Sequence, residues 1–157
     1  MMFDPIKIAE KYADVIPTPV FEIISEIGLG PEFQSLDDDV SGWIEKSDSG
    51  YLIVINKNHA LTRKRFTAAH ELGHYIYHRD LLGNGTGDTR AYRAECSPLP
   101  NAAIRPRHER QANSFAANFL MPVHAIEVLR QQGVHDAVDL AGRLGVSVDA
   151  MKIRLGL

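Results

Sequence analysis

The chain of 157 residues holds a single cysteine, Cys96, so it can form no internal disulfide framework. It has no apolar run near 18 residues long, and residues 1–5 lack the basic and apolar pattern of a signal peptide. With 17 basic and 20 acidic residues the net charge is −3, so the chain as a whole does not attract nucleic acid. These absences favour a reducing, cytoplasmic setting without a membrane span.

Residues 70–74 read His70-Glu71-Leu72-Gly73-His74, a complete H-E-x-x-H motif. On an α-helix, residues four apart lie one turn apart on the same face, so both histidines can present a ring nitrogen to one Zn²⁺. Glu71 lies beside the first histidine, where its carboxylate can take a proton from the attacking water of a metallopeptidase. The motif predicts two metal ligands, His70 and His74, and a general base, Glu71. The alternative is a surface helix on which these side chains align by chance.

The surroundings of the motif favour a helix over residues 61–78. This run contains no proline, Gly73 is its one breaker, and Asn56, Asn58 and Thr62 are candidate N-terminal caps. Glycine inside a helix costs about 1 kcal/mol relative to alanine. We therefore expect Gly73 to be the place where a second helix packs closely against this one.

The rest of the chain predicts an α+β fold, mostly helical with a small antiparallel β-sheet. Strands are expected over 40–46 and 51–56, joined by the turn 47–50. A segment rich in glycine and proline, 82–107, is expected to be a loop that either covers the metal site as a lid or is disordered. Further helices are expected over 5–12, 19–27, 107–120 and 122–131, with two short ones in 136–157.

A catalytic zinc usually has three protein ligands and one open position. The extended zincin pattern, H-E-x-x-H-x-x-G-x-x-H, would supply a third histidine, but Tyr77 and Asp80 occupy its last two fixed positions. The third ligand must then come from elsewhere, as in His₂Glu sites. The candidates are His78, Asp80, Glu95 and Glu109.

These candidates differ in how well they could reach the ion. His78 lies about two turns after His70 on the same helix, over about 12 Å of rise, which favours a supporting role over ligation. Glu95 stands in the glycine- and proline-rich loop, a poor platform for fixed geometry. Glu109 opens a helix whose small residues would let it approach Gly73, although an exposed first-turn carboxylate is the alternative. The residues alone leave the third ligand open, with Glu109 slightly ahead.

Residues 65–74 read R-F-T-A-A-H-E-L-G-H, and residues 109–122 read E-R-Q-A-N-S-F-A-A-N-F-L-M-P. Together with the segments 41–44 and 51–56, these stretches resemble the ImmA/IrrE family of zinc metallopeptidases. The resemblance covers roughly residues 5–125, and it departs at Phe119, where the pattern more often has leucine. It implies a zincin-like domain with an H-E-x-x-H active-site helix.

The resemblance also implies the roles of individual residues. The metal ligands would be His70, His74 and Glu109, with Glu71 as the catalytic base. Asn113 would support Glu109 from one turn further along, and His78 is the other candidate for a supporting residue. The metal would be Zn²⁺, although a His₂Glu site also accepts Mn²⁺ or Fe²⁺.

The predicted function is that of a zinc-dependent, site-specific endopeptidase. Its protein substrate, by the resemblance, is a helix-turn-helix repressor or antitoxin, typically encoded next door in a stress response, mobile element or toxin–antitoxin pair. The alternative is a non-cleaving binding partner, a toxin or regulator with a zincin fold that holds an Xre-type repressor or antitoxin. The intact Glu71 favours the enzyme, since a binding protein has no chemical need for the base.

We expect residues 1–125 to form the metallopeptidase domain and residues 126–157 a helical segment packed on the same domain. Within it, residues 139–151 resemble the turn region of a helix-turn-helix. However, residues 136–157 have no net charge, because three aspartates balance three basic side chains. Packing on the body or docking a partner is therefore the favoured interpretation, and direct DNA binding is disfavoured.

Overall fold

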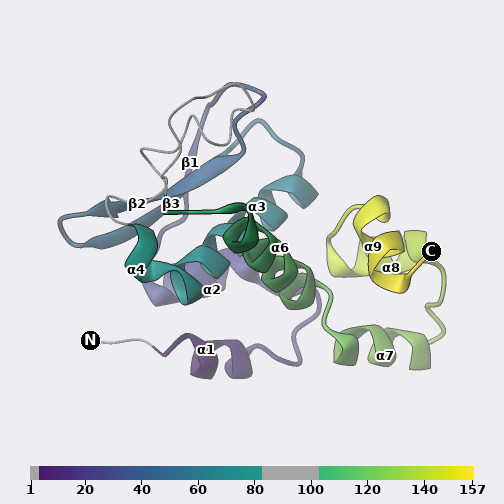
Figure 1. Ribbon diagram of the computed structural model, residues 1–157. Helices are drawn as coiled ribbons and strands as arrows, with labels where there is room; N and C mark the ends of the chain where they lie inside the picture. Colours follow the sequence, from purple (N-terminus) through teal and green to yellow (C-terminus); the bar gives the residue numbers. More distant parts are fainter. Residues whose placement is uncertain (1–3, 83–102) are drawn as a thin grey trace.

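The structure, a computed structural model, describes residues 4–82 and 103–157 (Figure 1). Among these residues no helix is both long and apolar enough to cross a membrane. Residues 83–102 of the expected loop over 82–107, with Glu95, lie outside the described residues. The described elements, in chain order, are α1 (Pro5–Lys11), α2 (Val20–Ile27), β1 (Glu32–Gln34), β2 (Gly42–Ser47), β3 (Gly50–Asn56), α3 (Leu61–Tyr77), α4 (Arg79–Leu82), α6 (Pro106–Leu120), α7 (Val123–Gln131), α8 (Ala137–Leu144) and α9 (Val148–Leu155).

The α+β fold class is confirmed, and the predicted helices and strands are present within about two residues of their expected ends. The sheet has the order β1-β3-β2. The hairpin β2–β3 is antiparallel as predicted, but β1 pairs with β3 in parallel, with Glu32 opposite Val54. The sheet is therefore mixed, and its antiparallel part is the predicted hairpin. The short, largely exposed β1 has too few residues to show a strand pattern in the sequence.

The expected caps of the metal-motif helix were also wrong. α3 begins after Ala60, which forms no side-chain cap. Asn56 is instead buried, and its amide donates to the carbonyl oxygens of Asp37 and Val40 at 3.1 and 2.9 Å. Asn56 thus stabilises the loop before β2 and does not cap the start of α3.

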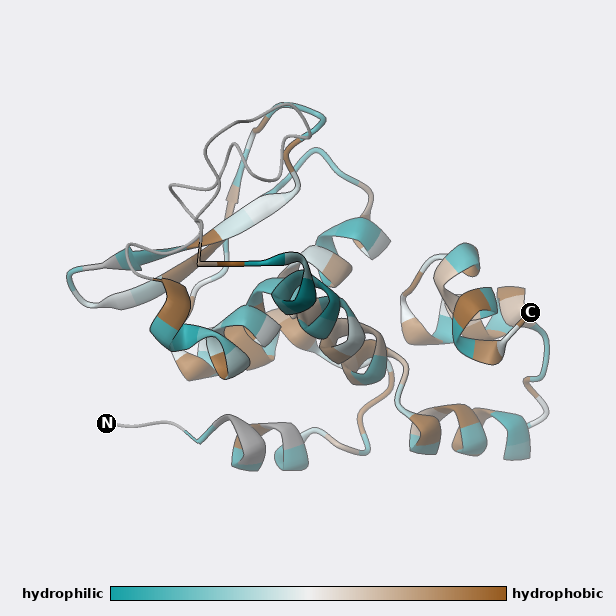
Figure 2. Ribbon diagram, in the orientation of Figure 1, coloured by the Kyte–Doolittle hydropathy of each residue, from teal (hydrophilic) through white to brown (hydrophobic). Residues whose placement is uncertain are grey.

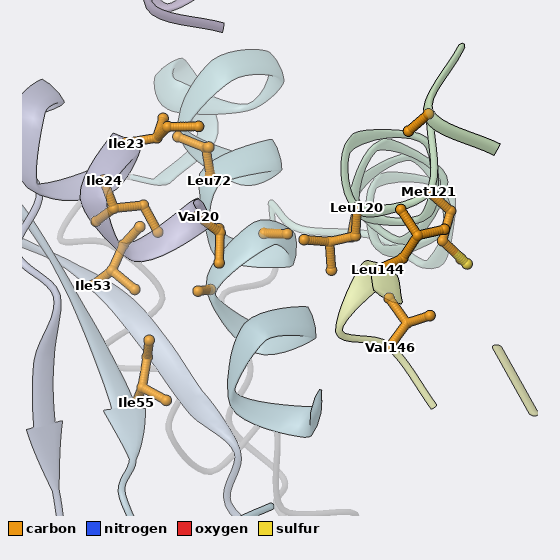
Figure 3. Close-up of a cluster of buried hydrophobic side chains, with 14 of the residues drawn as sticks. Val20, Ile23, Ile24, Ile53, Ile55, Leu72, Leu120, Met121, Leu144 and Val146 are labelled. Carbon is orange, nitrogen blue, oxygen red and sulfur yellow. The ribbon is translucent and has the colours of Figure 1, made fainter. Parts of the chain in front are cut away.

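The main core lies between the sheet and the helices α2, α3 and α6. Figure 3 shows Ile53 of β3 next to Ile24 of α2, and Leu72 of α3 next to Ile23, with Ile55 further along β3. Hydrophobic and hydrophilic residues share α6 and α7 (Figure 2), as expected for helices with one buried face. α3 therefore has its central turns, which carry the H-E-x-x-H motif, inside the protein.

The helices α7, α8 and α9 occupy the end of the molecule away from the sheet (Figure 1). Arg65 of α3, only 7% exposed, reaches the turn between α8 and α9. Its Nε donates to the Gly145 carbonyl at 3.0 Å, and its Nη2 donates to the carbonyls of Thr18 at 2.8 Å and Leu144 at 3.4 Å. Burial lowers the pKa of Arg65. The predicted boundary at residue 125 stays a prediction, but this side chain links segments on both sides of it.

Replacing Arg65 by methionine is expected to destabilise the protein by about 2–4 kcal/mol, because buried carbonyl groups lose a charged donor. Arg63→Met is the matched control. Arg63 donates to Ser41 Oγ at the exposed surface, and its loss should change stability by less than about 0.5 kcal/mol. Urea denaturation compares the two variants, and equal stabilities would contradict a structural role for Arg65.

Gly73 is the point where α3 and α6 approach each other, as the sequence predicted. A Cβ atom on Gly73 would lie 3.0 Å from Phe115 Cδ1 and 3.3 Å from Ala112 Cα. The close neighbour Ala112 Cα is backbone and cannot rotate away. α6 is thereby brought directly against the turn of α3 that separates the two motif histidines.

Gly73→Ala is therefore expected to destabilise the fold by about 1 kcal/mol, because the crowding outweighs the gain in helix propensity. Gly142→Ala in α8 is the control, since a Cβ there meets nothing within 4 Å. It should instead stabilise by about 0.5–1 kcal/mol. Thermal unfolding distinguishes the two, and stabilisation by both substitutions would show that the contact at Gly73 is not tight.

Candidate metal centre

Two helices supply the candidate site. His70, Glu71 and His74 lie on the buried middle of α3, and Glu109 lies in the first turn of α6. The partial positive charge at the start of a helix favours a carboxylate there. The close crossing at Gly73 puts this first turn beside the two histidines.

His70, His74 and Glu109 converge on one point. Nε2 of His74 lies 2.6 Å from Glu109 Oε1, and Nε2 of His70 lies 3.2 Å from Glu109 Oε2. The three ligand atoms lie within 4.8 Å of one another, and within the described residues these side chains form a group that could hold a metal ion. Both histidines are at most 2% exposed and the Glu109 side chain is 20% exposed. Two imidazole nitrogens and one carboxylate fit the donor set of a catalytic Zn²⁺.

Each histidine of this group has a further partner on its other ring nitrogen. Nδ1 of His70 lies 2.7 Å from Asn113 Oδ1, and Nδ1 of His74 lies 2.9 Å from His78 Nδ1. Such partners orient metal-binding imidazoles and set which nitrogen carries the proton. The sequence placed Asn113 beside Glu109, whereas the structure places its amide oxygen on His70. His78 lies behind His74, outside the group of three.

Gln111 is a residue that the sequence missed. Its Oε1 lies 2.7 Å from Nε2 of His78, and its side chain comes from the exposed part of α6. Burial is the largest cause that lowers the pKa of His78, which favours its neutral form. The sequence could not predict this contact. It depends on which face of α6 points toward α3, and the residues 109–113 do not reveal that face.

The remaining candidates are placed as follows. Glu71 is fully buried on α3, next in sequence to His70. Asp80 lies in α4 and is not part of the group of three. Glu95 lies outside the described residues. Among the candidates within the described residues, Glu109 is the one whose carboxylate joins the group formed with the two histidines.

A largely helical α+β fold with an H-E-x-x-H helix and a His–His–Glu group defines the zincin-like metallopeptidase class. The family model of the IrrE N-terminal-like domain, a peptidase family, matches residues 34–156. The chain belongs to this family, which is zinc-dependent. The match includes α7 to α9, so it extends beyond the region of resemblance recognised in the sequence.

Solved structures support the fold. A Mycobacterium tuberculosis transcriptional regulator is similar with a TM-score of 0.63 and 16% sequence identity. The match covers 97% of this chain and 46% of the regulator chain, so this chain spans less than half the length of that protein. At this identity the likeness shows the fold alone. A comparison with curated protein sequences gave no significant match.

Proposed function

We propose that this chain is a zinc endopeptidase that cleaves a helix-turn-helix repressor or antitoxin at a defined site. Cleavage would relieve repression in a stress response or mobile element, in the cytoplasm. The observation that carries the proposal is the convergence of His70, His74 and Glu109 on one point, with Glu71 adjoining the first histidine. Membership of a zinc-dependent peptidase family supports the same chemistry.

The residues divide the work as follows. Zn²⁺ held by His70, His74 and Glu109 would polarise the scissile carbonyl and lower the pKa of the attacking water. Glu71 would accept the proton of that water and pass it to the leaving amine. Mn²⁺ or Fe²⁺ could take the same site, since its donor set accepts several divalent ions.

A groove beside the site offers room for a polypeptide. It has a volume of about 720 Å³ and runs between α6 and α9, with Phe66 of α3 in its lining. Asn113 lines it as well, and the same side chain contacts His70, so the groove adjoins the proposed metal centre. Ile153 of α9 lines the groove and is 79% exposed. We propose that an apolar part of the substrate chain, next to the scissile bond, binds here.

Ile153→Glu is expected to reduce cleavage of the partner about tenfold, because an apolar contact worth about 1.4 kcal/mol is lost. Zinc content should not change. Val138→Glu is the matched control, since Val138 is another exposed apolar residue, 62% exposed, on α8 outside the groove lining. Cleavage rates with the purified partner test this, and equal effects of the two variants would contradict the assignment of the groove.

The experiment that tests the function is co-expression with the product of a neighbouring gene whose sequence predicts a helix-turn-helix. The parent chain is compared with Glu71→Gln, and the length of the partner is read by mass spectrometry. A defined cut that requires Glu71 supports a site-specific peptidase. An intact partner that co-purifies with both forms would favour the alternative, a zincin-fold protein that binds without cutting.

A further inference from the structure

A line of polar side chains runs from the candidate metal centre to the protein surface. It begins at His74, which is fully buried, passes through His78, which is 3% exposed, and ends at the exposed Gln111. The two steps are Nδ1 to Nδ1, 2.9 Å, and His78 Nε2 to Gln111 Oε1, 2.7 Å. Both are normal hydrogen-bond distances, so each step needs one donor and one acceptor.

The proton positions along this line depend on one another. A neutral imidazole has one nitrogen that donates and one that accepts. If Nε2 of His74 holds a metal ion, it carries no proton, and Nδ1 of His74 must be the donor. His78 then accepts at Nδ1 and carries its own proton on Nε2. That proton is donated to the amide oxygen of Gln111.

If donors and acceptors were reversed along this line, His74 could not bind a metal ion. If the Gln111 amide donated its N–H to His78, then His78 would donate from Nδ1 to His74. His74 would in turn carry its proton on Nε2, where the metal must bind. Gln111 is the third side chain from the metal position, after His74 and His78. Whether its amide oxygen or its amide nitrogen faces His78 nevertheless decides which nitrogen of His74 is available.

We propose that His78 and Gln111 are positioning residues that hold the Nδ1–H form of His74 and so make its Nε2 ready for a metal ion. This inference rests on the proposed metal site and deepens it. His108 helps to hold the arrangement, because its ring lies 4.8 Å from that of His78, centroid to centroid. The Arg105 backbone N–H donates to Nδ1 of His108 at 2.8 Å and fixes that ring in turn.

The test is zinc affinity, measured by chelator competition on the full chain and four variants. His78→Phe keeps a flat ring without an acceptor, and zinc should bind about 10–100-fold more weakly. Gln111→Met removes the terminal acceptor and should weaken zinc about tenfold. Gln111→Glu, which can only accept, should bind zinc at least as well as the parent. Gln131→Met, at the exposed end of α7, should change nothing.

A spectroscopic measurement separates this role from a structural one. In the zinc-loaded, ¹⁵N-labelled parent, we expect a proton on Nδ1 of His74 and a nitrogen–nitrogen coupling to Nδ1 of His78. Absence of that coupling, or zinc binding by Gln111→Glu as weak as by Gln111→Met, would overturn the inference. Unfolding of the metal-free variants controls for stability.

The same measurements distinguish failure of this inference from failure of the proposed peptidase function. A parent that binds zinc and shows the coupling but cuts no partner leaves this inference standing and removes the peptidase. A parent that binds no zinc overturns the metal site and this inference together, and it is recognised because all five proteins then behave alike.

Discussion

A Glu71→Gln chain is expected to keep its zinc and its fold but to lose cleavage by about 10²–10⁴-fold, the usual worth of a general acid–base group. Glutamine has nearly the shape of glutamate, so the buried position on α3 remains filled. Its amide cannot accept the proton of the attacking water or return it to the leaving amine. The single-turnover rate on the purified partner measures the loss.

The zinc content of Glu71→Gln must be measured in the same preparation. A variant that lost its zinc would be inactive for a different reason, and the assignment of Glu71 would then have no support. Cleavage within about twofold of the parent rate would contradict a general-base role directly, because a loss of at least about 10²-fold is expected.

Glu109→Ala is expected to weaken zinc binding by more than about 100-fold. Outer partners of metal ligands are worth about 10–100-fold, and a direct ligand should exceed them. The remaining His70 and His74 would supply only two protein donors, fewer than the three of a catalytic site. Chelator competition or zinc content after dialysis measures the effect.

The competing interpretation of Glu109 is a first-turn carboxylate that only favours the start of α6. In that case Glu109→Ala would lower stability by about 0.3–1 kcal/mol and leave zinc affinity unchanged. Glu127→Ala, an exposed glutamate on α7, is the control for loss of charge. Equal zinc affinity of the two variants would remove Glu109 from the site.

Local patterns predicted the part of the site that one helix carries. His70, Glu71 and His74 fall within one short stretch, so helix periodicity alone places the two histidines on one face, with Glu71 next in sequence to the first. Gly73 could be interpreted for the same reason, because an unfavourable helix residue indicated a close crossing, which the structure confirms at Ala112.

The features that depend on tertiary geometry could not be predicted in this way. β1 has no periodic pattern of its own and exists because β3 offers it a parallel partner. Which side chain Asn113 contacts depends on how α6 is rotated about its own axis. A rotation by part of a turn decides whether Asn113 contacts Glu109 or His70. Glu109 itself was distinguished from the other candidates by the family resemblance, not by the residues alone.

The role of the C-terminal helices also depends on tertiary contacts. Their turn resembles a helix-turn-helix, but Arg154 of α9 donates to the Met121 carbonyl at 3.1 Å, at the end of α6. One of the two basic side chains in the last turn of α9 therefore makes a contact within the protein. That the segment does not read DNA stays a prediction, and a salt-dependent duplex-binding assay would test it.

The most direct test of the central claim is a crystal structure of the zinc-loaded chain with diffraction data collected at the zinc absorption edge. We predict one zinc per chain, bonded to Nε2 of His70, Nε2 of His74 and a carboxylate oxygen of Glu109, at about 2.0–2.2 Å. A zinc bound by other residues, or no anomalous peak between α3 and α6, would contradict it.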